Sequence, residues 1–372
     1  MSLSLAADIT QTPDGVFLGQ ARIEDLTASL PGEIFRAGDI TLDAREDGGL
    51  YSLRLDSGLF RAAYDGNLFV TPFVQEAIHL LYQDNLEHLF GGRHSRDDDE
   101  PDPGQSGSLT LQILDLNPLT GFLFPSLFVS PGSAVRADLR NEELTLDLSS
   151  ELTAWEQFLL QNLQLRCLTE GQRIRASVDA DRLQAAGFAA EHIDVDATAD
   201  TVIDLRLAFH NDDDDTRANL HTRVSFPDPG TDPYPIRIDL LPSDLAIAGH
   251  PWELSPASLR YRKEDLRIDG FALRNGEQSL LAGGVIGPAA SDTVRLLMND
   301  FDMGIANSFL TKPVDLQGLL TGRGEAFALT GPDKGILFDL QARHVSAAGI
   351  DLGHFYLQSH WDDPDKQFNV QI

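Results

Sequence analysis

The sequence contains few of the residues on which several classes of protein depend. Only one of its 372 residues is a cysteine, Cys167, so an intrachain disulfide and a cysteine-only zinc site are both excluded. Basic residues are also scarce, because 28 lysines and arginines stand against 58 aspartates and glutamates, a formal net charge of −30 at pH 7. A surface this acidic disfavours nucleic acid, and anionic headgroups repel it unless a local apolar feature overcomes the repulsion.

Long apolar runs are also missing. No window reaches the roughly 18 continuous apolar residues of a membrane-spanning helix. Hydrophobic residues nevertheless make up 42% of the chain, which predicts a large buried surface and, at this length, two domains or an elongated body. Strand-like patterns begin within the first ten residues and continue into the final KQFNVQI, which predicts a segment of a longer protein.

Motifs for catalysis and metal binding are absent from the sequence. Its ten histidines show no HExxH spacing, and there is no GxSxG elbow. The acidic runs at 97–100 and 212–215 lack the spaced ligands and turn glycine of a calcium loop, which favours solvated loops. The stretch TGRGEAFALTG lacks the Lys-Ser/Thr ending of a phosphate loop, so its glycines indicate bends in strands. We therefore predict a non-enzymatic protein without a metal or cofactor.

Alternating apolar and polar residues run along the whole chain, as in Ile236, Ile238 and Leu240. Short polar connections, such as Arg140 to Glu143 and Arg262 to Asp265, suit hairpin loops. Helical patterns are limited to residues 72–90 and a shorter stretch at 302–310, and they do not alternate with the strands. The sequence thus predicts a mainly β fold, an antiparallel meander that forms an elongated groove, open or closed, with one or two short helices.

Two polar interruptions divide the chain. Residues 91–108 are rich in Gly, Asp and Pro and are typical of a linker or long loop, and residues 210–217 resemble a loop tip. We place boundaries near 100 and near 245. The predicted segments are an N-terminal β segment with a helix (1–100), a central antiparallel β segment (101–245) and a C-terminal β repeat segment (246–372).

The C-terminal third carries a family resemblance. PWELSPASLRYRKEDLRIDGFALRNGEQSLLAGGVIG is followed by DTVRLLMNDFDMGIANSFL and VDLQGLLTGRGEAFALTG, and together they resemble the TamB/AsmA-like envelope proteins with translocation and assembly module repeats. The resemblance is firmest over residues 250–361. It implies a middle periplasmic segment of a protein anchored in the inner membrane. It also implies a taco-shaped β-groove, an outer-membrane barrel assembly factor as partner of the parent protein, and a role in outer-membrane biogenesis and phospholipid transport.

The apolar side chains of this region are the predicted groove lining, which would bind a phospholipid or another acyl-chain ligand. They are Leu259, Tyr261, Leu266, Ile268, Phe271, Leu273, Val294, Leu296, Met298, Ile336, Phe338 and Leu340. The alternative is that the same side chains form a closed β core, which is the usual outcome of such alternation.

Two other functions compete with the groove. An extracellular or periplasmic glycan-binding or adhesion module would stack Trp252 and Trp361 on sugar, although aromatic anchoring at strand ends explains these residues as well. A β-rich glycan hydrolase would need two carboxylates facing each other about 5–9.5 Å apart.

Overall fold

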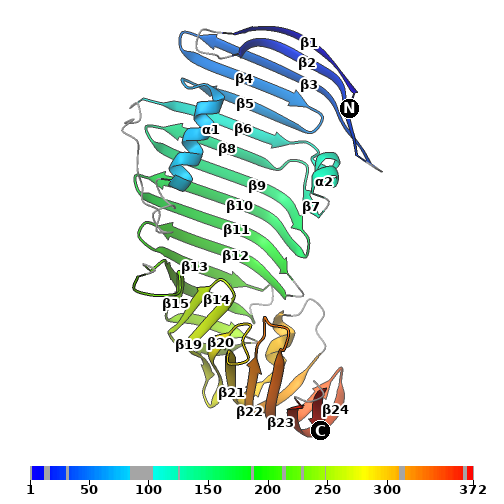
Figure 1. Cartoon of the computed structure of the whole chain (residues 1–372), viewed down its shortest axis with the longest axis vertical. Coiled ribbons are helices and arrows are strands. Elements are labelled where there is room, and N and C mark those ends of the chain that lie inside the picture. Colours follow the sequence, from blue (N-terminus) through cyan, green and yellow to red (C-terminus); the bar gives the residue numbers. More distant parts are fainter. Residues whose placement is uncertain are drawn as a thin grey trace. The chain divides into compact units, whose positions relative to one another are not determined.

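A computed structural model describes the chain over residues 2–11, 17–30, 33–83, 104–124, 126–185, 188–211, 215–227, 230–247, 249–309, 315–362 and 367–371. The chain divides into two compact units, one of residues 1–186 and 193–200 and the other of residues 187–192 and 201–372. The three segments predicted from the sequence, with boundaries near 100 and 245, remain a prediction. The predicted fold class is confirmed, because both units consist mainly of antiparallel strands (Figure 1).

The first unit is a meander in which successive strands are hydrogen-bonded neighbours, from the pair β1–β2 to the pair β10–β11. The short β7 pairs with the end of β9, beside β8. The strands are β1 (Ser2–Gln11), β2 (Phe17–Leu30), β3 (Glu33–Asp47), β4 (Leu50–Ser57), β5 (Phe60–Gly66), β6 (Ser106–Ile113), β7 (Leu127–Val129), β8 (Ala134–Arg140), β9 (Glu143–Trp155), β10 (Phe158–Glu170) and β11 (Arg173–Ala185), and β12 (Phe188–Ala199) contributes to both units.

The second unit continues the same pattern with shorter and more irregular strands. They are β13 (Ile203–His210), β14 (Arg217–Ser225), β15 (Ile236–Leu240), β16 (Ser243–Ile247), β17 (His250–Leu254), β18 (Ala257–Arg262), β19 (Asp265–Asn275), β20 (Gln278–Ile286), β21 (Thr293–Asp302), β22 (Gln317–Phe327), β23 (Gly335–Ala347), β24 (Ile350–Asp362) and β25 (Gln367–Gln371). The predicted hairpin at Arg262 to Asp265 is present, because these two residues are paired and Lys263 adopts the left-handed conformation of a tight turn.

Prolines interrupt two long strands of the second unit at neighbouring positions. Pro242 separates β15 from β16 and Pro256 separates β17 from β18, since a proline has no N–H to donate to the ladder. On the next strand the register shifts between Ile268 and Phe271, around Gly270 at φ +78°. Such a bulge adds one residue, so Ile268 and Phe271 lie on the same face although they are three residues apart.

The helices cover only parts of the sheets. Helix α1 (Val70–Ile78) continues into a π-helical turn, η1 (His79–Gln83), and lies across the strands of the first unit (Figure 1). The helix predicted at 72–90 is confirmed up to residue 83, and residues 84–90 lie outside the described part. The shorter predicted helix is a 3₁₀ turn, η3 (Met303–Phe309), whose Gly304 N–H is capped by the Asp302 carboxylate at 2.7 Å. Helix α2 (Asn117–Leu123) was not predicted.

The cores lie beneath these helices. Under α1, the fully buried Tyr64 and Phe73 pack with their rings 5.0 Å apart, against Leu139 and Leu144. Under η3, Trp252 packs against Phe301 with ring centroids 5.6 Å apart. Elsewhere on the same faces, most apolar side chains are only partly buried.

A candidate apolar binding face

The strand register of the second unit places all twelve predicted lining residues on one face of the sheet. Alternate residues of a strand point to the same face, and directly paired residues on neighbouring strands do so too. One row of paired positions runs from β18 to β23 through Leu259, Ile268, Gly284, Val294, Ala326 and Ile336. Two parallel rows contain Phe271, Leu296 and Phe338, and Leu273, Met298 and Leu340.

Little of the described chain covers this face. Only Leu273 and Val294 of the twelve side chains are buried, and seven others are half-buried. Leu296 is 36% exposed, Tyr261 42% and Ile336 49%. A closed core built from the described residues would bury these side chains, whereas an uncovered face accounts for their exposure. Whether they bind lipid stays a prediction.

The face has a corrugated surface that the sequence did not lead us to expect. Large apolar side chains stand on β19, β21 and β23, whereas the positions of β22 paired with Met298, Leu296 and Val294 are small. On β20 two small positions lie on this face between the larger Leu280 and Ile286. These small residues are Ala282 and Gly284 on β20, and Gly322, Gly324 and Ala326 on β22. Strands lie about 4.8 Å apart, so the ridges on alternate strands lie about 10 Å apart. We call the two strips of small residues the β20 lane and the β22 lane.

The backbone requires glycine at one position in each lane. Gly284 and Gly322 have φ values of +124° and +145°, and a Cβ on either would come within 2.2 Å of a neighbouring carbonyl oxygen. Gly324 differs, because its φ is ordinary and a Cβ there would meet its nearest neighbours, the Leu296 Cβ and the Leu337 carbonyl oxygen, at 3.9 Å. A larger side chain therefore fits the backbone at Gly324 but fills the lane.

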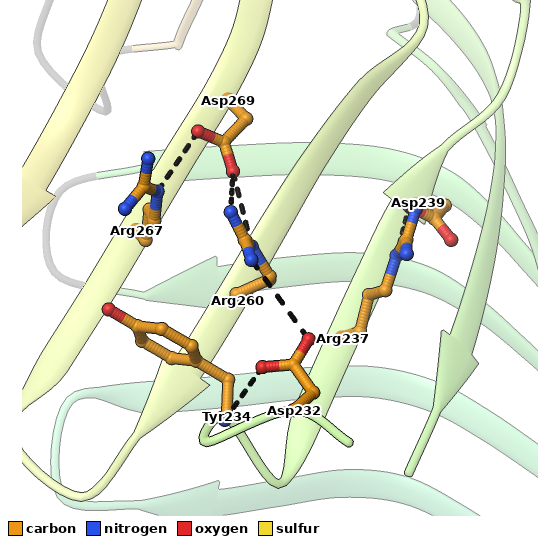
Figure 2. Close-up of polar contacts among 7 residues, drawn as sticks. All are labelled: Asp232, Tyr234, Arg237, Asp239, Arg260, Arg267 and Asp269. Carbon is orange, nitrogen blue, oxygen red and sulfur yellow. Dashed lines mark hydrogen bonds and ion pairs between the residues drawn. The ribbon is translucent and has the colours of Figure 1, made fainter. Parts of the chain in front are cut away.

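The opposite face of the second unit carries charged side chains (Figure 2). The Asp269 carboxylate accepts hydrogen bonds from Arg260 at 2.7 Å and Arg267 at 3.1 Å, while Arg237 pairs with Asp239 at 2.9 Å. Burial opposes ionisation of Asp269, but the two arginines outweigh it and keep the pKa of that carboxyl below its usual value. Charge and apolar surface are thus separated onto the two faces, and the lanes offer contact to hydrocarbon rather than to a headgroup.

A hollow in the first unit is unrelated to this apolar face. It has a volume of about 890 Å³ and lies on the polar face of the strands β1 to β6. Its charged lining is largely neutralised within the protein, because Arg61 pairs with Asp56 at 3.0 Å and Arg45 pairs with Asp43. We find no reason in its chemistry to assign it a ligand.

The other candidate residues do not come together as a site. Trp252 is buried beneath η3, Trp155 is exposed, and the side chain of Trp361 lies outside the described part. The acidic runs at 97–100 and 212–214 lie outside it too. Among the residues that the structure describes, no three His, Cys, Asp or Glu side chains are grouped so as to hold a metal ion. None of the helices in that part is long and apolar enough to cross a membrane.

Comparison with known proteins does not identify a family. No protein-family model, no curated protein and no solved structure matches the chain. The resemblance to TamB/AsmA-like proteins therefore depends on the sequence pattern alone and stays a prediction.

Proposed function

We propose that the chain is a non-enzymatic middle segment of a periplasmic TamB-like protein and that its apolar face holds acyl chains during phospholipid transport or outer-membrane assembly. The parent protein would be anchored in the inner membrane and would act with an outer-membrane barrel assembly factor. The observation that supports this proposal is the pair of small-residue lanes between apolar ridges on an uncovered face.

Burial of hydrocarbon supplies the energy for binding in a lane. The β22 lane spans three alternate positions, about 14 Å at 3.4 Å per residue, so it holds only part of an acyl chain. Each CH₂ that is fully buried contributes about 0.8 kcal/mol before the entropy of ordering the chain is subtracted. No described charge on the rows of paired residues fixes one position along a lane. Many similar weak contacts would let an acyl chain move along the lane rather than remain in one pocket.

Filling one lane tests the proposal directly. In Gly324→Leu the new side chain occupies the β22 lane without straining the backbone. We expect the protein to stay folded and to lose the phospholipid that is otherwise found with it. The measurement is native mass spectrometry with organic extraction, on protein purified from a bacterial envelope without detergent.

The matched control is Gly283→Leu. Gly283 pairs with Arg295 on the opposite face, and a Cβ there would meet only the Ile268 carbonyl oxygen at 3.6 Å. Both variants make the same chemical change on strands of one sheet, but only Gly324→Leu should reduce the bound lipid. A second pair, Leu296→Asp and Leu297→Asp, places one charge on each face in the same way. Wild-type protein without lipid, or equal lipid in both members of each pair, would rule out the conduit.

The glycan-binding alternative has less support from the residues on which it depended. Trp252 is 4% exposed and packs against Phe301, so it has no free ring face for a sugar. Glycan binding without bound lipid in the experiment above would restore this alternative.

A further inference from the structure

One stretch of the chain carries no charge. Residues 116–135, LNPLTGFLFPSLFVSPGSAV, include no acidic, basic or histidine side chain, although charged residues make up 23% of the sequence. A protein with a net charge of −30 is repelled by anionic surfaces, and a charge-free apolar segment is the local feature that can overcome that repulsion. The structure describes this segment except for Pro125 and the side chain of Phe122.

Helix α2 uses only one side of this segment for packing. Leu116 and Leu119 pack on the buried Leu59 and hold the helix against the first unit. The other end of the helix is left uncovered, since Leu123 is 52% exposed and the following Phe124 is 62% exposed. The side chains of Leu123 and Phe124 therefore do not contribute to the core around Leu59.

Two further apolar residues lie at the same end of the sheet. Strand β7 follows α2 and pairs with β9, which places Leu127 opposite Trp155, and Trp155 is opposite Phe158 across the turn between β9 and β10. The backbones are joined by hydrogen bonds from the Leu127 N–H to the Phe124 carbonyl at 2.8 Å and from the Glu156 N–H to the Ser126 carbonyl at 3.1 Å. Figure 1 shows α2 and β7 beside each other at this end of the strands.

These four side chains form what we call the aromatic rim, namely Leu123, Phe124, Trp155 and Phe158. Trp155 is 58% exposed and Phe158 44% exposed. Tryptophan and phenylalanine are the residues that soluble domains insert at the boundary between headgroups and acyl chains. The charge-free segment beside them adds no charge that would have to be desolvated there.

We propose that the aromatic rim is a membrane contact that enters the interfacial region of a zwitterionic lipid bilayer. Glu156, in the turn between Trp155 and Phe158, together with the overall negative charge, disfavours anionic lipids at this point. The same charge opposes a second copy of the chain as the occupant, because two highly acidic molecules repel each other. This inference is independent of lipid binding in the lanes, since it concerns the first unit alone.

The test is flotation of the full chain with phosphatidylcholine vesicles. Phe124→Asp should weaken vesicle binding by about tenfold or more, since it removes an inserted apolar side chain and adds a charge. Trp155→Ser is the second variant, in a different element, and should weaken binding in the same direction. The matched control is Leu50→Asp, because Leu50 is 62% exposed but begins β4, away from the rim. Circular dichroism checks that each variant is folded.

Fluorescence locates the contact. Lipids carrying a quencher at the interface should quench the wild type, and this quenching should fall in Trp155→Phe, where the other two tryptophans remain. Wild type that does not float, or an equal loss in Leu50→Asp, would overturn the inference. So would vesicle-independent self-association abolished by Phe124→Asp, which would make a second copy the occupant. Gly324→Leu should float like the wild type, so a failure of the lanes and a failure of the rim give different results.

Discussion

Gly107 on β6 makes room for the docking of α1, and the change Gly107→Ala tests how closely that helix is packed. A Cβ at this position would lie 2.7 Å from both Phe73 Cδ2 and the Tyr64 hydroxyl oxygen, and 3.0 Å from Tyr64 Cε2. Its φ is not in the left-handed range, so contact rather than backbone strain sets the cost. Carbon atoms pack at about 3.5–4.0 Å, so the Phe73 ring has to withdraw by about 1 Å.

The expected cost is about 1–3 kcal/mol of unfolding free energy for the first unit, the range for overpacking a core. A further cost of about 1–3 kcal/mol arises if the Tyr64 hydroxyl loses its 2.6 Å hydrogen bond to the Leu68 carbonyl. Phe73→Ala alone should cost about 3–5 kcal/mol, because it leaves a cavity beneath α1. The double variant Gly107→Ala/Phe73→Ala should lose less unfolding free energy than the two single variants together. The contact between the new Cβ and the Phe73 ring is absent once that ring is removed.

The assay has to resolve one unit from the other, because a chain with two compact units need not unfold in a single step. Hydrogen exchange measured by mass spectrometry on peptides covering 60–66 and 106–113 reports on β5 and β6 directly. Gly121→Ala is the control, since a Cβ there would meet no atom within 4 Å beyond its chain neighbours and the backbone of its own helix, and its helical position favours alanine. Unchanged protection in Gly107→Ala, or additive costs in the double variant, would refute this account of the packing.

Two further predictions concern pH. Burial, and then the charge of Asp65, raises the pKa of Tyr64 from 10.0 to about 12; the folded state therefore holds the phenolic proton more tightly, and this part of its stability is lost as the pH rises through that window. Tyr64→Phe should flatten the alkaline limb of a urea-midpoint-against-pH curve, and an unaltered limb would contradict the argument. Hydrogen bonds from the Thr321 hydroxyl, at 2.6 Å, and from Arg343 lower the pKa of Asp300 below 3.8, so the stability it contributes is present above that pH and is lost on further acidification. Asp300→Asn should therefore flatten the acid limb, and a steeper loss than in the wild type would show that another group is responsible.

The sequence predicted helices and strands well where one spacing of apolar residues, helical or alternating, ran through the whole element. Alternation along Ile236, Ile238 and Leu240 predicted a strand, and β15 covers those residues. The helix expected from 72 begins at Val70, because Pro72 is tolerated within a first turn, where its missing N–H has no partner in any case. Helix α2 was missed because its seven residues, which include a proline and a glycine, are too few to show a helical period.

The candidate face was predicted only in part. Alternation identified which residues of β21 and β23 share a side, and the register agrees with that choice. On β19 it did so only within each half, because Ile268 and Phe271 share a face through the bulge at Gly270. The lanes were missed, since the glycines of β22 were interpreted as bends and those of β20 received no interpretation. The available signal was small residues at every second position, Ala282 and Gly284 on one strand and Gly322, Gly324 and Ala326 on the other.

By itself, the sequence determined the strands, their two-sided character and the acidity of the molecule, because these depend on the period of a single strand and on counted charges. Only the tertiary structure decided which strands face each other, where bulges such as that at Gly270 shift the phase, and which apolar side chains remain uncovered. The physical reason is that alternation assigns each residue to one of two faces but does not determine the neighbouring strand or its register. The lanes and the aromatic rim arise from those pairings.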